Sequence, residues 1–335
     1  MTPKYYNRLQ VHPKAHPDVI KAAHRALMKL HHPDHDANSG TAAAEINEAF
    51  EVLSDPDKRH AYDEKGTALK GKVVGSYRIL NKIAEGGFGK TYKAEHVDVG
   101  TPVCIKHCTE ISPENEVILV EEARAMWDLR HYALPAVRDL LRLDDGSLAL
   151  VMSYIEGPTI SQIVEKHGPI EPEHVAWITQ RVLHALYYIH ANGVIHGDLK
   201  PQNIIIQPNS HNAVLVDFGL AMVKPKANDK AKGFTDLFAP PEQLKGEVLL
   251  PESDLFSLGM TMLYAINGGN VKRVAAREVP TTVPDPMCAF VKRLIVREPL
   301  SRPRVWEKEN LLETIEAVRK ESFGRVHSNM KPLAI

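Results

Sequence analysis

The sequence lacks the long apolar runs that cross or enter a membrane. No stretch of about 18 apolar residues occurs in its 335 residues, and the segment from Met1 to Gln10 has no apolar run of the secretory kind. Cysteine is scarce as well, because Cys104, Cys108 and Cys288 form an odd, poorly spaced set without a disulfide framework. We therefore expect a cytoplasmic protein in a reducing compartment, with no membrane span.

An excess of charge is also missing. The 41 Lys and Arg residues stand against 42 Asp and Glu, a formal net charge of −1 at pH 7. Binding to a polyanion normally needs a basic surplus, so we expect no nucleic-acid partner. The hydrophobic share of 44% and the charged share of 25% exclude collagen-like, disulfide-scaffold and largely disordered chains.

The organisation changes near residue 70. Residues 2 to about 65 have apolar positions three and four apart, as in amphipathic helices, and the segment around Pro33 interrupts them. The two apolar groups are Ile20, Ala23, Leu27 and Leu30, then Ile46, Phe50 and Leu53. After a Gly- and Lys-containing stretch, alternating strand-like segments come first and helical patterns follow past about residue 155. We expect a domain over 1–66, a linker over 67–75, a second domain over 76–320 and a tail over 321–335.

A basic stripe lies on the first predicted long helix. Lys21, Arg25 and Lys29 are four residues apart, on a face turned away from the apolar positions, and His32, Pro33 and Asp34 follow the stripe. Alone, such a stripe is typical of a solvated helix face. A zinc site of His31, His32 and His35 is a weaker alternative, because Pro33 constrains two of these side chains apart.

This part of the chain resembles the J domain of DnaJ-type co-chaperones over nearly all of residues 4–66. The matching residues are Tyr5, Tyr6, His32, Pro33, Asp34, Ile46, Glu48, Ala49, Phe50, Leu53, Asp55, Lys58, Arg59, Tyr62 and Asp63. The resemblance implies an all-α helical hairpin in which His32, Pro33, Asp34 and the basic stripe engage an Hsp70-type chaperone and stimulate its ATP hydrolysis. The sequence departs from the family at His24 and His31, where Tyr is usual.

A run of small residues opens the second domain. It comprises Ile83, Ala84, Glu85, Gly86, Gly87, Phe88, Gly89, Lys90, Thr91 and Tyr92, and we expect it to form a loop between strands. Glycines let backbone N–H groups approach phosphate oxygens closely, although such runs also serve as plain hairpin turns.

The sequence pattern around a lysine and a glutamate further along the chain predicts an ion pair between them. Lys106 lies on the opposite strand face from Val103 and Ile105. On a helix expected from about Pro113 to Arg130, Glu122 shares an apolar face and needs a cationic partner, because an unpaired buried charge is costly. Lys106 is the natural candidate for that partner.

Two later segments concentrate carboxylate, ammonium and amide groups. Asp198, Lys200 and Asn203 fall within one short loop, and Asp217 ends the strand predicted from Ala213 to Val216. Asp and Asn oxygens suit Mg²⁺, and a lysine can neutralise a transferring phosphoryl group. The set predicts phosphoryl transfer.

At this point residues 76–318 closely resemble eukaryotic-type protein kinases. The resemblance implies a bilobal fold with a β-rich first lobe and an α-rich second lobe, so the predicted fold class is multidomain, α followed by α+β. It implies that residues 83–91 cover the phosphates of ATP, that Lys106 paired with Glu122 holds them, and that Met152 and Tyr154 lie where adenine binds. Asp198 would act on the substrate hydroxyl, Lys200 would stabilise the γ-phosphoryl group, and Asn203 and Asp217 would hold Mg²⁺.

Further matches favour protein substrates over small molecules, and because no insert typical of tyrosine kinases follows Asp198, we expect Ser or Thr acceptors. The matches are Thr235, the Pro240-Pro241-Glu242 triplet, Asp254, and Arg302 as the partner of Glu242. Ala84 replaces the first loop glycine, and Gly197 replaces the Arg that pairs with a phosphorylated residue in most regulated kinases. Residues 220–234 contain no Ser, Thr or Tyr but four lysines, so we expect activity without phosphorylation there and a preference for acidic substrate segments.

The sequence thus predicts an ATP- and Mg²⁺-dependent serine/threonine protein kinase with a J domain that recruits or stimulates Hsp70. The alternative is a J-domain co-chaperone whose kinase-like domain is a pseudokinase scaffold. Retention of Lys106, Glu122, Asp198, Asn203 and Asp217 argues against the scaffold.

Overall fold

The computed structural model describes residues 3–12, 15–30, 40–59, 71–86, 89–109, 112–207, 210–303, 310–324 and 333–335. The chain divides into two compact units, Met1–Asn81 and Lys82–Ile335, and the division falls inside strand β2. Among the described residues, no helix is both long and apolar enough to cross a membrane.

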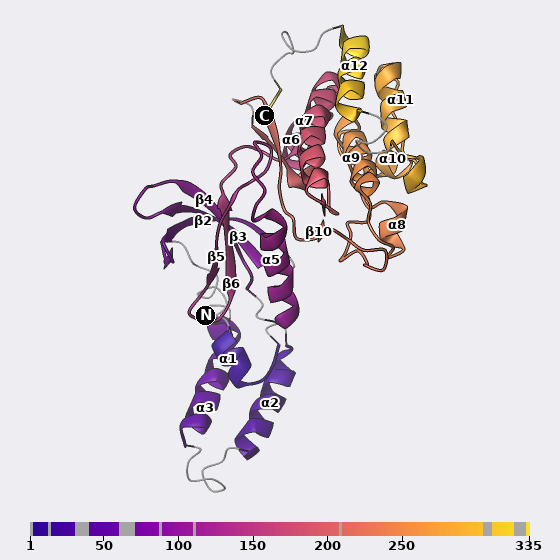
Figure 1. Cartoon of the computed structure of the whole chain (residues 1–335). Helices are drawn as coiled ribbons and strands as arrows, with labels where there is room; N and C mark the ends of the chain where they lie inside the picture. Colours follow the sequence, from indigo (N-terminus) through magenta and orange to yellow (C-terminus); the bar gives the residue numbers. More distant parts are fainter. Residues whose placement is uncertain are drawn as a thin grey trace. The chain divides into compact units, whose positions relative to one another are not determined.

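The first unit begins with three helices, α1 (Pro3–Arg8), α2 (Pro17–Leu30) and α3 (Gly40–Ser54), drawn in indigo and violet in Figure 1. Residues 56–59 are also helical. The small core of these helices contains Tyr6, Leu9, Ile20, Leu27, Ile46, Ala49 and Leu53. The predicted pairing of two amphipathic helices is therefore present, with the short helix α1 added.

The apolar positions of α2 do not all face this core. Ile20 and Leu27 are buried, but Leu30 at the end of the helix is 70% exposed, contrary to the prediction. Leu30 is the last residue of α2, and the core of these helices includes Ile20 and Leu27 but not Leu30. Lys21, Arg25 and Lys29 are exposed as predicted, whereas His32, Pro33 and Asp34, like His31 and His35, lie outside the described residues.

The histidine at position 24 packs as an aromatic residue would. Its ring stacks on Phe50 of α3, with centroids 4.0 Å apart and an interplanar angle of 13°. Its Nε2 lies 2.9 Å from Asn47 Oδ1, also on α3. His24 therefore joins α2 to α3 both by ring stacking and by a polar contact.

A six-stranded sheet follows, with the strand order β1-β2-β3-β4-β6-β5. Its strands are β1 (Val73–Val74), β2 (Tyr77–Gly86), β3 (Gly89–His96), β4 (Pro102–His107), β5 (Val137–Arg142) and β6 (Leu148–Ser153). Helix α5 (Pro113–Met126) lies in sequence between β4 and β5, and Ser112 caps it by accepting a bond from Asn115 N–H. Residues 83–86, expected in a loop, instead complete β2, and residues 89–92 begin β3.

Helix α5 ends four residues before the predicted end at Arg130. The guanidinium of Arg130 donates to the carbonyl oxygens of Trp127 and Leu129, each at 2.8 Å, and the Arg130 N–H donates to Tyr188 Oη at 2.9 Å. These bonds satisfy carbonyls that a continuing helix would use, and the Tyr188 contact crosses 58 residues. Local apolar spacing gives no indication of such a long-range stop.

The rest of the second unit is mainly helical (Figure 1). Its helices are α6 (Ile160–His167), α7 (Pro172–Ala191), α8 (Pro241–Leu244), α9 (Pro251–Ile266), α10 (Val271–Ala275), α11 (Asp285–Leu294) and α12 (Leu311–Phe323), with 3-10 turns η1 (Pro201–Asn203) and η2 (Pro299–Ser301). Short strands pair as β7 (Val194–Ile195) with β10 (Met222–Val223), and β8 (Ile204–Gln207) with β9 (Asn212–Leu215). The strand predicted from Ala213 thus begins one residue earlier.

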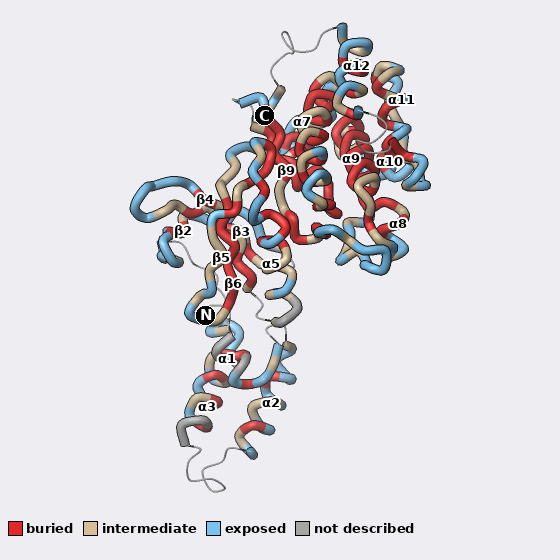
Figure 2. The backbone as a smooth tube through the Cα atoms, in the orientation of Figure 1, coloured by how far each residue is buried: buried red, intermediate tan, exposed pale blue. Residues whose placement is uncertain are grey.

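Helix α9 forms the centre of this helical part, as Figure 2 shows by the red tube of α7 and α9. Nearly all residues of α9 are buried, most of them apolar, and the buried polar side chains Ser253 and Asp254 are hydrogen-bonded. A strand-rich part followed by a helix-rich part is the order that the sequence predicts.

Candidate active site

Three neighbouring strands bring the predicted nucleotide residues onto one face of the sheet. Thr91 of β3 and Leu150 of β6 lie directly opposite Lys106 of β4, and Met152 lies opposite Cys104. Directly opposed residues share a face, and so do residues two apart on one strand. Lys106, Thr91, Cys104 and Met152 therefore form one surface. Burial raises the pKa of the Cys104 thiol to about 12, so this side chain stays neutral there.

The predicted phosphate-covering residues occupy the ends of two strands. Ile83, Ala84 and Glu85 are exposed on β2, whereas Gly87 and Phe88 lie outside the described residues. Gly89 has φ 138°, and a Cβ there would come 2.1 Å from the His107 carbonyl oxygen, so only glycine fits. This close approach keeps the start of β3 tight against β4.

Lysine side chains contact two further residues that were predicted to bind the nucleotide, Glu85 and Tyr154. Glu85 accepts from Lys82 Nζ at 2.7 Å, and Lys90 Nζ lies 3.6 Å from Glu85 Oε1. Tyr154, just past β6, has Lys93 Nζ 4.4 Å from its ring centroid.

Lys106 forms ion pairs with carboxylates from two other segments of the kinase domain. Its Nζ lies 2.7 Å from Glu122 Oε2 on α5 and 2.7 Å from Asp217 Oδ1, which follows β9. Burial opposes the ammonium charge, but the two carboxylates outweigh it and raise the pKa of Lys106 above its usual value. Lys106 is therefore a fixed cation at neutral pH.

The pKa values of the two carboxyl groups beside Lys106 shift in opposite directions. Glu122 is 1% exposed, and burial raises its pKa despite the lysine. The Asp217 side chain is 44% exposed; burial acts to raise its pKa, but Lys106 outweighs this effect and the pKa lies below its usual value. The lowered pKa keeps the Asp217 carboxyl ionised at neutral pH.

Asp217 adopts a strained backbone conformation. Its φ is 65°, in the left-handed region that non-glycine residues seldom occupy. Such strain persists only where surrounding contacts impose it, and it concentrates at functional sites. Here the bond from Lys106 Nζ and a longer one from Gly219 N–H at 3.4 Å fix the carboxylate.

The segment of residues 196–203, called the catalytic loop below, joins three polar side chains. Asp198 Oδ2 accepts from Lys200 Nζ at 2.6 Å, and Asp198 Oδ1 accepts from Thr235 Oγ1 at 2.7 Å. Lys200 Nζ also donates to Thr235 Oγ1 at 3.0 Å. Asn203 Nδ2 donates to the Asp198 carbonyl oxygen at 2.8 Å. The Asp198 carboxylate is thereby oriented by a cation and a hydroxyl at once.

A buried aspartate accepts hydrogen bonds from the backbone of this loop. Asp254 of α9 accepts backbone N–H bonds from His196 at 2.8 Å and Gly197 at 2.9 Å, and a third bond from His190 Nε2 at 2.8 Å. Burial would raise the pKa of Asp254, but His190 and these N–H groups lower it, so the carboxylate is ionised.

The sequence did not assign a role to His196, which links the two halves of the site. Its Nδ1 lies 3.2 Å from the Asp198 N–H and its Nε2 lies 3.2 Å from the Val216 carbonyl oxygen. Nδ1 accepts a hydrogen bond from the Asp198 N–H, and Nε2 can bond to the Val216 carbonyl oxygen only as a donor. The ring proton of His196 therefore lies on Nε2. His196 therefore ties the residue before Asp217 to Asp198, and only its place next to Asp198 could have suggested this.

Glu242 and Arg302 form a bidentate ion pair. Arg302 donates to the two Glu242 carboxylate oxygens at 2.6 and 2.9 Å, and the residues are 3% and 2% exposed. Ser253 Oγ adds a further bond to Glu242 at 2.8 Å. The pair joins the start of α8 to the segment after η2.

The donor set fits a divalent metal of the hard type. Asp217 supplies an ionised, half-exposed carboxylate, and Asn203 uses its amide nitrogen on Asp198, which leaves an amide oxygen. Among the residues that the structure describes, no group of three or more His, Cys, Asp or Glu side chains could bind a metal alone. Mg²⁺ is normally bound by one or two protein oxygens together with phosphates and water, so the two residues suffice.

Comparison with known proteins agrees with this geometry. Residues 77–307 match the family model of the protein kinase domain, more than half of the chain. The chain belongs to the protein kinase family. Residues 4–63 match the model of the DnaJ domain. The predicted combination of a J domain with a kinase domain in one chain, and the bilobal fold, are thereby confirmed.

Bacterial serine/threonine kinases are among the similar proteins. The chain is 33% identical over 212 residues to the serine/threonine-protein kinase pkn3 of Myxococcus xanthus, covering 59% of this chain and 39% of that protein. It is 29% identical to PrkC of Bacillus subtilis, covering 59% and 31%, and 28% identical to PkaA of Streptomyces coelicolor, covering 77% and 52%. The chain thus spans about a third to a half of these relatives. They support the predicted serine/threonine protein kinase class.

The kinase domain brings Lys106, Glu122, Asp217, Asp198, Lys200 and Asn203 into two bonded groups, while Lys21, Arg25 and Lys29 belong to the J-domain unit. The roles predicted for these residues stay predictions.

Thr235 should position Asp198 and Lys200. Replacing it by valine removes the hydroxyl that bonds both, and a hydrogen bond to a charged group contributes about 1.5–3 kcal/mol. We expect T235V to lower kcat roughly ten- to a hundredfold, and T235S to retain most of it. Steady-state kinetics of the two variants measures this, and equal rates for T235V and wild type would contradict the assignment.

Proposed function

We propose that the chain is an ATP- and Mg²⁺-dependent protein serine/threonine kinase whose J domain brings an Hsp70-type chaperone to the kinase domain. The observation that carries the proposal is the position of Lys106, bonded at 2.7 Å to both Glu122 and Asp217. These contacts join α5, the sheet and the segment that follows β9 in the arrangement that phosphoryl transfer needs.

Each polar group then has one task. Lys106 would bind the nucleotide phosphates, and Asn203 and Asp217 would hold the metal, which when bound would neutralise phosphate charge. Asp198 orients the Ser or Thr hydroxyl of a protein substrate and accepts its proton, while Lys200 compensates the charge that develops on the transferred group. Thr235 and His196 keep Asp198 in place.

The J domain would raise the local concentration of a substrate. Lys21, Arg25 and Lys29 are exposed on α2. They and the motif residues His32, Pro33 and Asp34 would engage Hsp70. A tethered site sees its partner at an effective concentration set by the linker, often millimolar. Hsp70, or a client that it carries, would thereby reach the kinase domain.

The kinase half is tested with labelled ATP, Mg²⁺, a purified Hsp70 and a generic protein substrate. We expect labelled phosphoserine or phosphothreonine with the wild-type chain and none with K106M, since the methionine keeps an unbranched side chain one atom shorter but loses the cation. Equal incorporation by both proteins would favour the scaffold alternative.

The J-domain half needs a separate readout. We expect the chain to increase the steady-state ATPase rate of Hsp70 several-fold, and H32Q to abolish the increase while K106M retains it. Stimulation that survives H32Q would contradict the assignment of the J-domain surface. Kinase activity toward a generic substrate should be equal in wild type and H32Q.

A further inference from the structure

Residues 220–235, called the activation segment below, contain no Ser, Thr or Tyr before Thr235. In regulated kinases such a segment is ordered by a phosphate that binds arginine side chains. Here the residue before Asp198 is Gly197, and it could carry no such side chain. Its φ is 72°, and a Cβ there would come 2.8 Å from the Leu220 carbonyl oxygen.

Besides the Thr235 hydroxyl, a buried amide joins the activation segment to the catalytic loop. Gln243 Nε2 donates to the Gly197 carbonyl oxygen at 2.7 Å and to the Gly233 carbonyl oxygen at 2.7 Å. Gln243 is 3% exposed, so neither bond competes with bulk water. An NH₂ group has two donors, and both are used here.

The two carbonyls that Gln243 joins are placed next to catalytic groups. Gly197 directly precedes Asp198, and Gly233 lies two residues before Thr235, whose hydroxyl donates to Asp198. Gln243 therefore closes a ring of contacts that runs from Asp198 through Thr235 and Gly233 back to Gly197. We propose that Gln243 is a positioning residue that holds the activation segment against the catalytic loop in the absence of phosphorylation.

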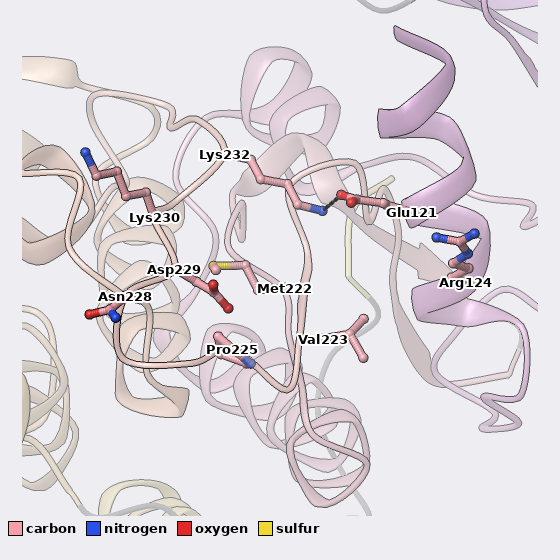
Figure 3. A pocket seen from close by; sticks show the side chains of 9 residues that line it. All are labelled: Glu121, Arg124, Met222, Val223, Pro225, Asn228, Asp229, Lys230 and Lys232. Atoms are coloured by element: carbon pink, nitrogen blue, oxygen red, sulfur yellow. Dashed lines mark ion pairs between the residues drawn. The ribbon is translucent and has the colours of Figure 1, made fainter. Parts of the chain in front are cut away.

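A neighbouring ion pair extends this restraint to α5. Lys232 Nζ lies 2.6 Å from Glu121 Oε2, and Glu121 directly precedes Glu122, the partner of Lys106. Figure 3 shows this pair at the edge of a cavity of about 570 Å³ between α5 and the activation segment. The side chains of Lys232 and Glu121 are 27% and 41% exposed, so salt weakens this contact whereas the Gln243 bonds are shielded.

The test compares Q243M with wild type, and L244M serves as the matched control. Methionine keeps the length of Gln243 and removes both donors, while Leu244 is the next residue of α8 and is 49% exposed. We expect Q243M to lower kcat at least tenfold, with the KM for ATP changed less than about twofold. Hydrogen exchange should accelerate in residues 228–236 and stay unchanged in α9. L244M should match wild type in every measurement.

The inference rests on the proposed kinase activity, but hydrogen exchange needs no activity and separates the two. Faster exchange in Q243M, with an inactive wild type, would overturn the kinase proposal and leave the restraint standing. Unchanged exchange and unchanged kcat would overturn the restraint. If Q243M does not fold, Q243N decides, because its amide is one methylene shorter and cannot reach both carbonyls. A wild-type kcat and exchange pattern in Q243N would contradict the proposal.

Discussion

Replacing Asp198 by asparagine is expected to lower the rate of phosphate transfer by about 10²–10⁴-fold, the contribution of a positioned general base. The asparagine keeps the size of the side chain and an oxygen for Lys200 or Thr235, but it cannot take a proton from the substrate hydroxyl. Single-turnover transfer of labelled phosphate measures the chemical step directly.

The control for D198N is nucleotide binding. Asp198 is bonded to Lys200 and Thr235, whereas Lys106 is bonded to Glu122 and Asp217, so ATP affinity should change less than about threefold. A D198N protein that binds ATP and still transfers phosphate at a tenth of the wild-type rate or faster would remove Asp198 from the chemistry.

Replacing Arg302 by methionine is expected to lower the free energy of unfolding by about 3–5 kcal/mol, because it leaves a buried charge without its partner. Glu242 is 3% exposed, and among the described residues Ser253 would be its remaining side-chain partner. Urea unfolding followed by tryptophan fluorescence reports the second unit alone, since Trp127, Trp177 and Trp306 all belong to it. R273M is the matched control, because the Arg273–Glu278 pair is about half exposed and 3.7 Å long. A change in R302M as small as in R273M would contradict the prediction.

The pH dependence of the same variant has a definite sign. Burial acts to raise the pKa of Glu242, but Arg302 outweighs it and the pKa lies below its usual value. A carboxyl with a lowered folded-state pKa contributes stability above its unfolded pKa of about 4.3, and this contribution is lost as pH falls through the folded value. The stability difference between wild type and R302M should therefore be largest near pH 7 and shrink below about pH 4. A difference that grows on acidification would contradict the account.

Patterns that repeat within one helix or strand could be predicted from the sequence. The alternation around Lys106 and the apolar row around Glu122 predicted a buried pair, and the two side chains lie 2.7 Å apart. The strand-rich and helix-rich halves followed from the same periodicities. Each of these signals lies within a few consecutive residues.

Features that depend on distant segments could not be read in this way. The Arg130 N–H bonds to Tyr188, 58 residues away, instead of continuing α5, and Leu30 is exposed although its spacing matches that of Leu27. Gln243 is an ordinary polar residue in the sequence, and only the fold shows that it bonds positions 46 and 10 residues away. Every residue has a backbone carbonyl, so the type of the accepting residue does not reveal that a distant side chain bonds to it.

The central claim is that this kinase domain is active with an unphosphorylated activation segment. The direct measurement is the initial rate of labelled phosphate transfer by the wild-type chain after exhaustive phosphatase treatment and removal of the phosphatase, with mass spectrometry of residues 220–235 as the check. The account predicts the same rate as the untreated protein, from the first turnover and without a lag. A rate that is lost on treatment and recovers only as the activation segment regains phosphate would contradict it.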